Sequence, residues 1–357
     1  MGGTTPSTTV SERAGQMPDL GETPTTRGAS REHRLLRRRQ PVPLTTALTI
    51  ALGVIWILDG LLQLQPAQFS AGFPVGIEMN AMAQPIAIAH LELAFGRLTS
   101  TAVAPFTVLI AAVQLILGAS MLTRRARPIA LAASIPWALA VWALGEGFGN
   151  IATGYAMLPT GAPGAALAYA VLAVLLLLDQ RSADGSRTRR DFGYAWSALW
   201  LLAAGLQLGS RVPLALMLRA NFNESAAGEP GVLGGLDHRL AEITGAHAVA
   251  ATALLAFVEL LLACAPWMSH QRLTLFATLG VLSILWVAGE NLGSILTGSA
   301  SDVGITPLLA LIALGAYDTR LESRAHPGIS PAHSVGPAPT RWRHRTTAAG
   351  ATAFVES

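Results

Sequence analysis

Two stretches of the sequence, 142–154 and 286–298, each place a glutamate among glycines inside an apolar run. They read WALGEGFGNIATG and WVAGENLGSILTG, and Trp, Gly, Glu, Gly, Ile, Thr and Gly fall at the same places in both. A carboxyl group inside an apolar segment is costly and is often retained for function. Glu146 and Glu290 are therefore candidates for binding a proton, an ion or a ligand. The alternative is structural, with each carboxyl bonding a neighbouring helix or the backbone of the loop that follows.

Other polar side chains also interrupt apolar runs. Asp59 and Gln63 lie one helical turn apart, and Gln114 lies in the next apolar run. For Gln114 and its second-half counterpart Glu259, an interhelical hydrogen bond is the alternative interpretation. We expect two groups of residues that bind a ligand or proton, one from each half: Asp59, Gln63, Gln114 and Glu146, then Gln207, Glu259 and Glu290.

The small residues beside the two glutamates are spaced by four. On a helix this spacing makes a ridge along which a second helix can approach closely, and such packing drives helix association in lipid. Each glutamate would then flank the contact face rather than point at lipid. The predicted helix-packing ridges are Gly145, Gly149 and Thr153, and Gly289, Gly293 and Thr297.

The sequence contains no familiar motif for catalysis or cofactor binding. We find no Walker loop, CxxC or HExxH, and no dinucleotide fingerprint in a usable context. The single cysteine, Cys264, excludes a disulfide framework within the chain and a Cys-based zinc site. Met79 and Met82 offer thioether ligands without the dense array that a soft metal would need. We therefore expect no resident metal and no catalytic residue, and whether the protein is an enzyme stays open at this point.

Composition places the chain among membrane proteins. It is 52% hydrophobic and only 13% charged. Several runs of about 18 or more residues are nearly free of charge, the length that crosses a bilayer as helix. We expect an all-α, polytopic membrane protein. Its eight predicted spans are 44–65, 102–122, 129–150, 163–179, 193–209, 246–266, 273–295 and 305–318.

The placement of arginine predicts the orientation of these spans. All 24 basic residues are Arg, and groups of them precede the first span and follow the second, fourth, sixth and eighth. Cytoplasmic segments carry such an excess, so both termini are expected in the cytoplasm, at a bacterial plasma membrane. The long loops 66–101 and 210–245 then lie outside. We expect the basic stretch 31–39 to set topology and touch anionic lipid rather than bind nucleic acid.

The chain also repeats itself. At a spacing of 144 residues Trp56 matches Trp200 and Pro163 matches Pro307, and over part of the interval the spacing becomes 145. An even number of spans in each copy gives two repeats of the same orientation. The predicted division is a disordered basic cytoplasmic tail (1–43), a first four-helix repeat (44–180), a cytoplasmic linker (181–192), a second four-helix repeat (193–318) and a disordered cytoplasmic tail (319–357).

The duplicated pattern W-x3-E-x2-G-x3-T-G, with a Pro-started helix after it, resembles an uncharacterised family of actinobacterial multi-span proteins, over about 44–318. That resemblance carries no known activity. Residues 108–133 and 254–277 are more distantly similar to the DoxX-like four-helix membrane proteins. That family includes a subunit of a thiosulfate:quinone oxidoreductase, so the resemblance implies quinone contact and a redox partner subunit. Its acidic residue corresponds to Glu259, whereas the first copy has Gln114.

Three functions follow as hypotheses. The first is a membrane module that binds or transports a small solute, ion or proton through a cavity lined by Asp59, Glu146, Glu259 and Glu290. The second is a DoxX-like membrane subunit of a quinone-linked redox system. The third is a scaffold in the lipid bilayer whose glutamates are structural.

Overall fold

The computed structural model describes residues 43–181, 185–210, 214–229 and 231–317. Within these ranges every regular element is helical and none is a strand. The chain divides into two compact units, 1–47 and 48–357. Of the first unit the structure describes only residues 43–47, where α2 begins. The predicted tails 1–43 and 319–357 lie outside the described residues, apart from Pro43.

A helix occupies most of each predicted span in the described part of the chain. Five segments are long and apolar enough to cross a membrane: Leu44–Leu62, Val103–Leu122, Arg127–Leu144, Ala248–Trp267 and Gln271–Gly289. This indicates a membrane location. The helices at the eight predicted spans are α2 (Leu44–Leu62), α5 (Val103–Leu122), α6 (Arg127–Leu144), α7 (Ala165–Arg181), α8 (Gly185–Leu208), α11 (Ala248–Cys264), α12 (Gln271–Ile284) and α13 (Thr306–Ala316).

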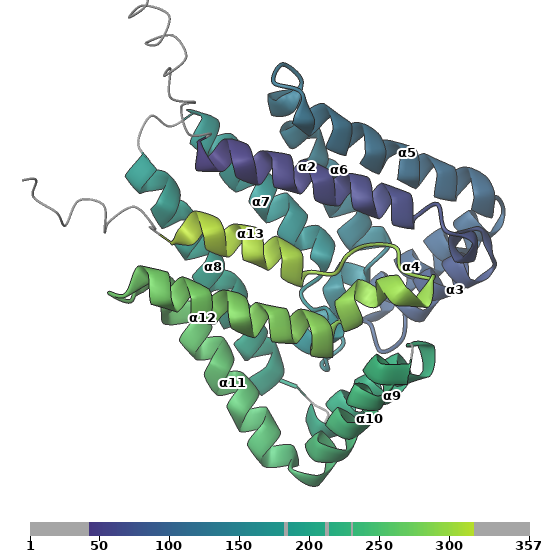
Figure 1. Cartoon of the computed structure of the whole chain (residues 1–357). Helices are drawn as coiled ribbons and strands as arrows, with labels where there is room; N and C mark the ends of the chain where they lie inside the picture. The colour runs from purple at the N-terminus through teal and green to yellow at the C-terminus, as the bar shows by residue number, and fades with distance from the viewer. Residues whose placement is uncertain (1–42, 182–184, 211–213, 230, 318–357) are drawn as a thin grey trace, which may run out of the picture. The chain divides into compact units, whose positions relative to one another are not determined.

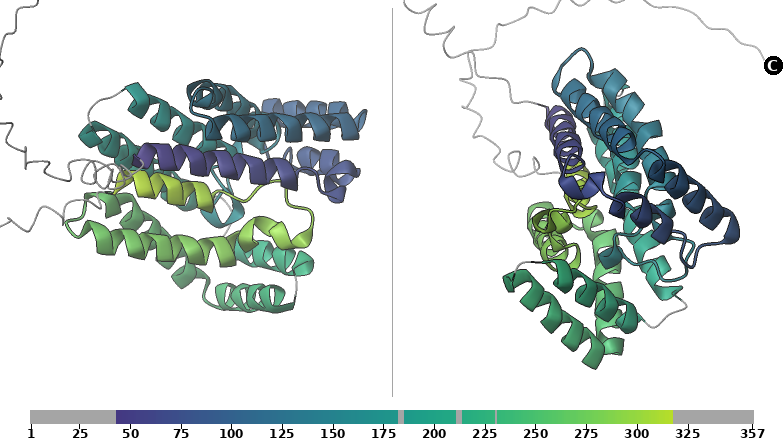
Figure 2. Two further views of the ribbon diagram at one scale, coloured as in Figure 1. Left: turned by 45° about the horizontal axis from the view of Figure 1, so that its top comes forward. Right: turned by 90° about the vertical axis from the view of Figure 1, so that its right-hand side faces the viewer.

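Both long loops expected between spans are instead folded into helices. The first contains the short turn η1 (Pro66–Phe69), α3 (Gly72–Met79) and α4 (Ile86–Ser100), with α3 packed on α4. The second contains α9 (Leu214–Gly228) and α10 (Gly231–Ala246), which form a tight helical pair (Figures 1 and 2). The predicted linker 181–192 is also shorter than expected, because α8 already begins at Gly185.

Small residues allow the closest helix crossings. A Cβ added to Gly53 of α2 would lie 2.9 Å from the Gly118 carbonyl oxygen of α5. At the corresponding crossing of α8 and α11, the Ser197 hydroxyl donates to the Ala263 carbonyl at 2.6 Å. Both contacts bring two backbones together, as packing in lipid favours.

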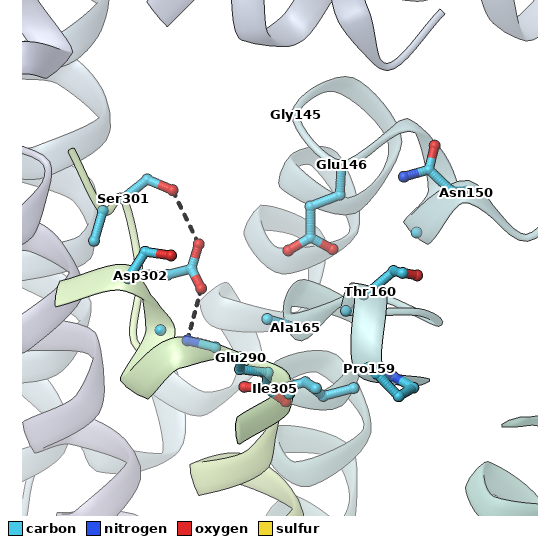
Figure 3. A pocket seen from close by; sticks show the side chains of 18 of the residues that line it. Gly145, Glu146, Asn150, Pro159, Thr160, Ala165, Glu290, Ser301, Asp302 and Ile305 are labelled. Carbon is cyan, nitrogen blue, oxygen red and sulfur yellow. Dashed lines mark hydrogen bonds between the residues drawn. The ribbon is translucent and has the colours of Figure 1, made fainter. Parts of the chain in front are cut away.

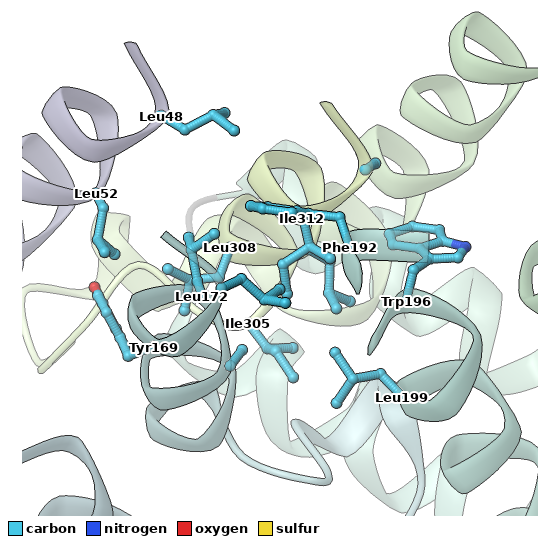
Figure 4. Packing of buried hydrophobic residues seen from close by; sticks show 14 of the residues in the cluster. Leu48, Leu52, Tyr169, Leu172, Phe192, Trp196, Leu199, Ile305, Leu308 and Ile312 are labelled. Atoms are coloured by element: carbon cyan, nitrogen blue, oxygen red, sulfur yellow. The ribbon is translucent and has the colours of Figure 1, made fainter. Parts of the chain in front are cut away.

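A single large apolar cluster holds the helices together. Phe192 of α8 and Leu172 of α7 are fully buried against Leu308 and Ile312 of α13 (Figure 4). Gly315 makes room for this packing, since a Cβ there would lie 2.2 Å from the Phe192 ring. Helix α13 also lies between α2 and α12 in every view (Figures 1 and 2). The segment leading into α13 is therefore held from several sides.

The prediction of unbroken helices over 129–150 and 273–295 is wrong at their ends. Helix α6 ends at Leu144, and α12 ends at Ile284 before a π-helical turn over Leu285–Gly289. The chain then makes a left-handed turn in both places. The predicted helical ridges Gly145, Gly149, Thr153 and Gly289, Gly293, Thr297 therefore do not form, because the turn breaks the four-residue spacing on a helix face.

Candidate functional site

Each repeated glutamate caps the helix that follows its turn. One oxygen of Glu146 accepts the Ala166 backbone N–H of α7 at 2.9 Å. Glu290 accepts the Thr306 backbone N–H of α13 at 3.2 Å, and its other oxygen accepts the Thr306 hydroxyl. A carboxylate at a helix N-terminus satisfies free N–H groups and meets the positive end of the helix dipole. The structural role expected as the alternative is thus present in both copies.

In both copies a tryptophan makes a second hydrogen bond to the loop before the same helix. We call each glutamate together with its tryptophan a clamp. The Trp142 indole N–H donates to the Pro163 carbonyl at 2.8 Å, and the Trp286 indole N–H donates to the Val303 carbonyl at 2.9 Å. Val303 therefore takes the place of Pro163. The match of Pro163 with Pro307 in sequence does not correspond to equivalent positions in the structure.

The second clamp closes a shorter loop. Twenty residues separate Glu146 from Ala166, and 16 separate Glu290 from Thr306. The loop of the second copy is shorter by four residues, so Thr306 stands where the first copy has Ala166.

The turn after each glutamate is left-handed over four residues. Gly147, Phe148, Gly149 and Asn150 have φ of 53°, 56°, 60° and 57°, and residues 291–294 have φ of 50°, 57°, 69° and 54°. Non-glycine residues pay about 1–2 kcal/mol each for this conformation. Such strain clusters at binding sites, where the surrounding structure holds it in place.

One glycine in each turn is required by contact as well as by conformation. A Cβ at Gly149 would lie 1.9 Å from the Pro163 carbonyl oxygen. A Cβ at Gly293 would lie 2.5 Å from the Val303 carbonyl. The repeated glycines Gly149 and Gly293 thus let each turn pack against the loop before the next helix, rather than letting two helices meet.

The two clamps meet around one polar cavity of about 520 Å³. The Glu146 carboxylate points into it, with Asp302 on one side and Thr160 and Asn150 on the other (Figure 3). No Arg or His is among the lining residues. Its other polar side chains are Asn80, Asn221, Glu290, Ser294, Ser299 and Ser301.

Both glutamates lie beyond the ends of the segments able to cross a membrane, Arg127–Leu144 and Gln271–Gly289. Burial, and secondly the charge of Asp302, raise the pKa of Glu146 to about 8, although the hydrogen bond from the Ala166 N–H opposes the shift. Burial raises the pKa of Glu290 to about 7, even though its hydrogen bonds with Thr306 oppose the shift. Glu146 is therefore the more readily protonated of the two.

The free bonding capacity of the two glutamates also differs. The second oxygen of Glu146 is buried and accepts no hydrogen bond, whereas both oxygens of Glu290 are engaged by Thr306. An unpaired buried polar atom is costly, and a bound ligand or proton would satisfy it. The structure thus distinguishes two glutamates that the sequence treats as equivalent.

Asp302 was not among the residues selected from the sequence. Its two oxygens accept the Gly304 N–H at 2.8 Å and the Ser301 hydroxyl at 3.0 Å. The position lies in a short polar loop and has no acidic counterpart in the first copy. Asn80, which directly follows α3, and Asn221 of α9 belong to the two long loops, in which the sequence predicted no helices and no site residues.

The residues expected to gather in the first half do so. Asp59, Gln63, Gln114 and Glu146 line a second cavity of about 290 Å³, which is mostly apolar. Asp59 accepts the Val303 N–H at 3.1 Å and a hydrogen bond from the Tyr169 hydroxyl. This cavity and the polar one have five lining residues in common: Gly145, Glu146, Ala165, Ser301 and Asp302.

The group expected in the second half, Gln207, Glu259 and Glu290, does not form: only Glu290 lines one of the two cavities. Gln207 donates to the Thr252 carbonyl at 3.0 Å, which is a helix-to-helix bond. Glu259 is fully buried on α11, and neither of its oxygens has a hydrogen-bond partner. Glu290 instead lines the polar cavity beside Glu146. Only the first half therefore forms the group that the sequence predicts.

A further pair of buried acids was also missed. Glu92 of α4 and Asp237 of α10 are almost completely buried, and they match at the spacing of 145. Burial raises the pKa of Glu92 to about 7 and also raises that of Asp237. The sequence signal for this pair is the repeat itself, because two acidic residues fall at matching positions of the two long loops.

No protein-family model, curated protein or solved structure matches the chain. Within the described ranges, no group of three or more His, Cys, Asp or Glu side chains is arranged to hold a metal ion.

Proposed function

We propose that the protein is a membrane module that binds or transports a small organic cation at the cavity between its two glutamate clamps. It would have eight spans in two parallel four-helix repeats, in a bacterial plasma membrane with both termini in the cytoplasm. Its immediate surroundings would be the lipid bilayer.

Corresponding contacts in the two halves support the repeat. The crossing of α2 and α5 at Gly53 and Gly118 has its counterpart at Ser197 and Ala263, at spacings of 144 and 145. The Glu146 N–H bonds to the carbonyl five residues earlier at 3.1 Å, as does that of Glu290 at 3.0 Å. Two identical departures from the helix at matching positions favour duplication over chance.

One observation carries the functional proposal: three carboxyl groups line a single cavity that contains no basic side chain. Glu146, Glu290 and Asp302 come from both clamps and the loop between Glu290 and α13. The carboxylates would repel anions there. They would attract a cation more strongly than in bulk water, because the effective dielectric constant of a partly buried cavity is lower. A volume of about 520 Å³ exceeds the need of a bare metal ion and suits a small organic molecule.

A proton is the natural competitor for this site. With the pKa of Glu146 raised to about 8, the carboxyl group is mostly protonated at neutral pH when the cavity holds no cation. A cation that pairs with the carboxylate displaces that proton. Binding would therefore release a proton, which is the property that a proton-coupled exchanger needs.

The test is thermal unfolding of the detergent-extracted full chain, followed by tryptophan fluorescence. Ethanolammonium, 1,4-diammoniobutane and tetramethylammonium are compared with acetate and with neutral tert-butanol. We expect at least one cation to raise the midpoint with its concentration, as a ligand of the folded state must. Acetate and tert-butanol should have no such effect. Stabilisation by no cation, or by acetate as well, would contradict the proposal.

The redox alternative would use the second cavity for a quinone. The indole N–H groups of Trp56 and Trp137 line it without partners and could donate to ring carbonyls. However, the carboxyl groups of Asp59, Glu146 and Asp302 line the same cavity, and their negative charge, where present, matches a cation and not a neutral quinone. We therefore favour the cation. Quinone recovered with the purified protein would reverse this preference.

A further inference from the structure

The second cavity is rich in aromatic side chains, and we call it the aromatic cavity. Phe95 of α4 and Phe106 of α5 meet edge to face, with ring centroids 6.4 Å apart. Trp56 and Tyr169 stack at 4.0 Å. All four line the cavity, together with Phe73 and Trp137. Aromatic faces present the negative side of their quadrupole and attract cations.

The aromatic cavity adjoins the polar one at its acidic wall. Glu146 and Asp302 line both cavities, and Asp59 lines the aromatic one. Like the polar cavity, the aromatic one has no Arg or His among its lining residues. The two cavities therefore have an acidic wall in common, formed by these two shared carboxyl groups.

Three classes of ligand can be weighed against this arrangement. A neutral apolar molecule fills the aromatic cavity but leaves the carboxyl groups unmatched. A small polar cation matches the carboxyl groups but leaves about 290 Å³ of apolar space unused. A cation with an apolar group satisfies both, because its charge lies at the shared wall and its apolar part is removed from water.

We propose that the ligand is a hydrophobic organic cation of the aryl-ammonium or alkyl-ammonium class. Its ammonium head would lie at Glu146 and Asp302, and its apolar group among Phe95, Phe106 and Trp137. This inference rests on the proposed function and narrows the class of substrate.

Isothermal titration calorimetry on the full chain in detergent tests it with three probes. Tetramethylammonium carries the head alone, benzyltrimethylammonium carries the head and a phenyl ring, and benzyl alcohol carries the ring without charge. We expect benzyltrimethylammonium to bind about tenfold or more tightly than tetramethylammonium, since burying a ring is worth at least that factor. Benzyl alcohol should bind more weakly than benzyltrimethylammonium by a similar factor.

Variants locate the effect. Phe106→Leu keeps an apolar side chain and removes a ring, so it should abolish most of the tenfold gain and leave tetramethylammonium within about twofold of its original affinity. Phe95→Leu provides the same test if Phe106→Leu does not fold. The matched control is Phe276→Leu on α12, a side chain that is 72% exposed and lines neither cavity.

The outcomes separate this inference from the proposed function. If the two cations bind equally well and Glu146→Gln weakens both, the cation site stands and the aromatic extension is wrong. If neither cation binds, the proposed function fails and this inference fails with it. Equal losses in the Phe106→Leu and Phe276→Leu variants would also overturn the assignment of the ring to the aromatic cavity.

Discussion

The same substitution should have different consequences at the two repeated glutamates. In Glu146→Gln the amide oxygen can still accept the Ala166 N–H, so the cap on α7 survives. What is lost is the charge on the oxygen that has no partner within the protein. In Glu290→Gln both atoms face Thr306, and one acceptor becomes a donor. The first variant should therefore lose ligand affinity, and the second should lose stability.

The size of each effect follows from the contacts. A hydrogen bond to a charged group contributes about 1.5–3 kcal/mol, so Glu146→Gln should weaken cation binding roughly 10-fold to 150-fold. A weakened helix cap costs about 0.5–2 kcal/mol, so Glu290→Gln should lower the free energy of unfolding by that amount. Glu290→Gln should weaken cation binding less than Glu146→Gln does, because both oxygens of Glu290 are already engaged by Thr306 and only its charge is lost from the cavity.

Calorimetry for affinity and thermal unfolding for stability measure the two effects on the same preparations. Glu242→Gln, at an exposed position on α10, is the control and should change neither quantity. The reasoning is refuted if Glu146→Gln unfolds earlier with its affinity unchanged, since the glutamate would then be a cap and nothing more. It is equally refuted if both variants lose affinity to the same extent.

Three further predictions concern pH and packing. Because Glu146 holds a proton up to a pKa of about 8, cation affinity measured by calorimetry should rise by up to about tenfold per pH unit between pH 6 and 7.5 and level off above 8. In Glu146→Gln the rise should be much smaller, with only the titration of Glu290 near pH 7 remaining in this cavity. Gly149→Ala should lower the free energy of unfolding by about 2 kcal/mol or more, because the added Cβ would collide with the Pro163 carbonyl and because the residue has a φ of +60°. Gly280→Ala, where the added Cβ has open space around it, is the control and should not lower the free energy of unfolding. Burial raises the pKa of Glu92 from 4.5 to about 7 in the folded protein, so the folded state loses stability as the pH rises through that interval. Glu92→Gln should therefore raise the unfolding midpoint more at pH 8 than at pH 5. Equal shifts at the two pH values would contradict this explanation.

The sequence predicted most of the helices because their signal is local. Long apolar runs such as 103–122 and 248–264 have the length and composition of a span, whatever they contact. The grouping of Asp59, Gln63 and Gln114 was also predictable, since residues at similar depth on adjacent helices have few other places to point. Periodicity and length were sufficient for these features.

The turns after Leu144 and Ile284 were not predictable in the same way. The sequence GEGFG is compatible with a glycine ridge on a helix and with a left-handed turn, and only the position of the next helix decides between them. The Cβ contact between Gly149 and Pro163 joins residues that sequence spacing cannot bring together. Asp302 was missed because its importance comes from a cavity formed by segments far apart in the chain.

The difference between the two glutamates is traced to one equivalent position. Thr306 supplies both a backbone N–H and a hydroxyl to Glu290, whereas Ala166 supplies only its N–H to Glu146. A hydroxyl at position 166 would find the free oxygen of Glu146 at the same place on the helix. Divergence at this position would thus convert a structural cap into a site with one unpaired acceptor.

Exchanging the two residues should exchange the two roles. Ala166→Thr should satisfy the second oxygen of Glu146 and weaken cation binding about tenfold, while leaving the unfolding midpoint unchanged or higher, because a buried unpaired oxygen gains a partner. Thr306→Ala should lower stability and leave an oxygen of Glu290 free in the same cavity. Ala166→Ser offers the hydroxyl with less bulk and should reproduce the effect if Thr is too large. Undiminished affinity in a folded Ala166→Ser variant would show that the free oxygen of Glu146 is not what the ligand contacts.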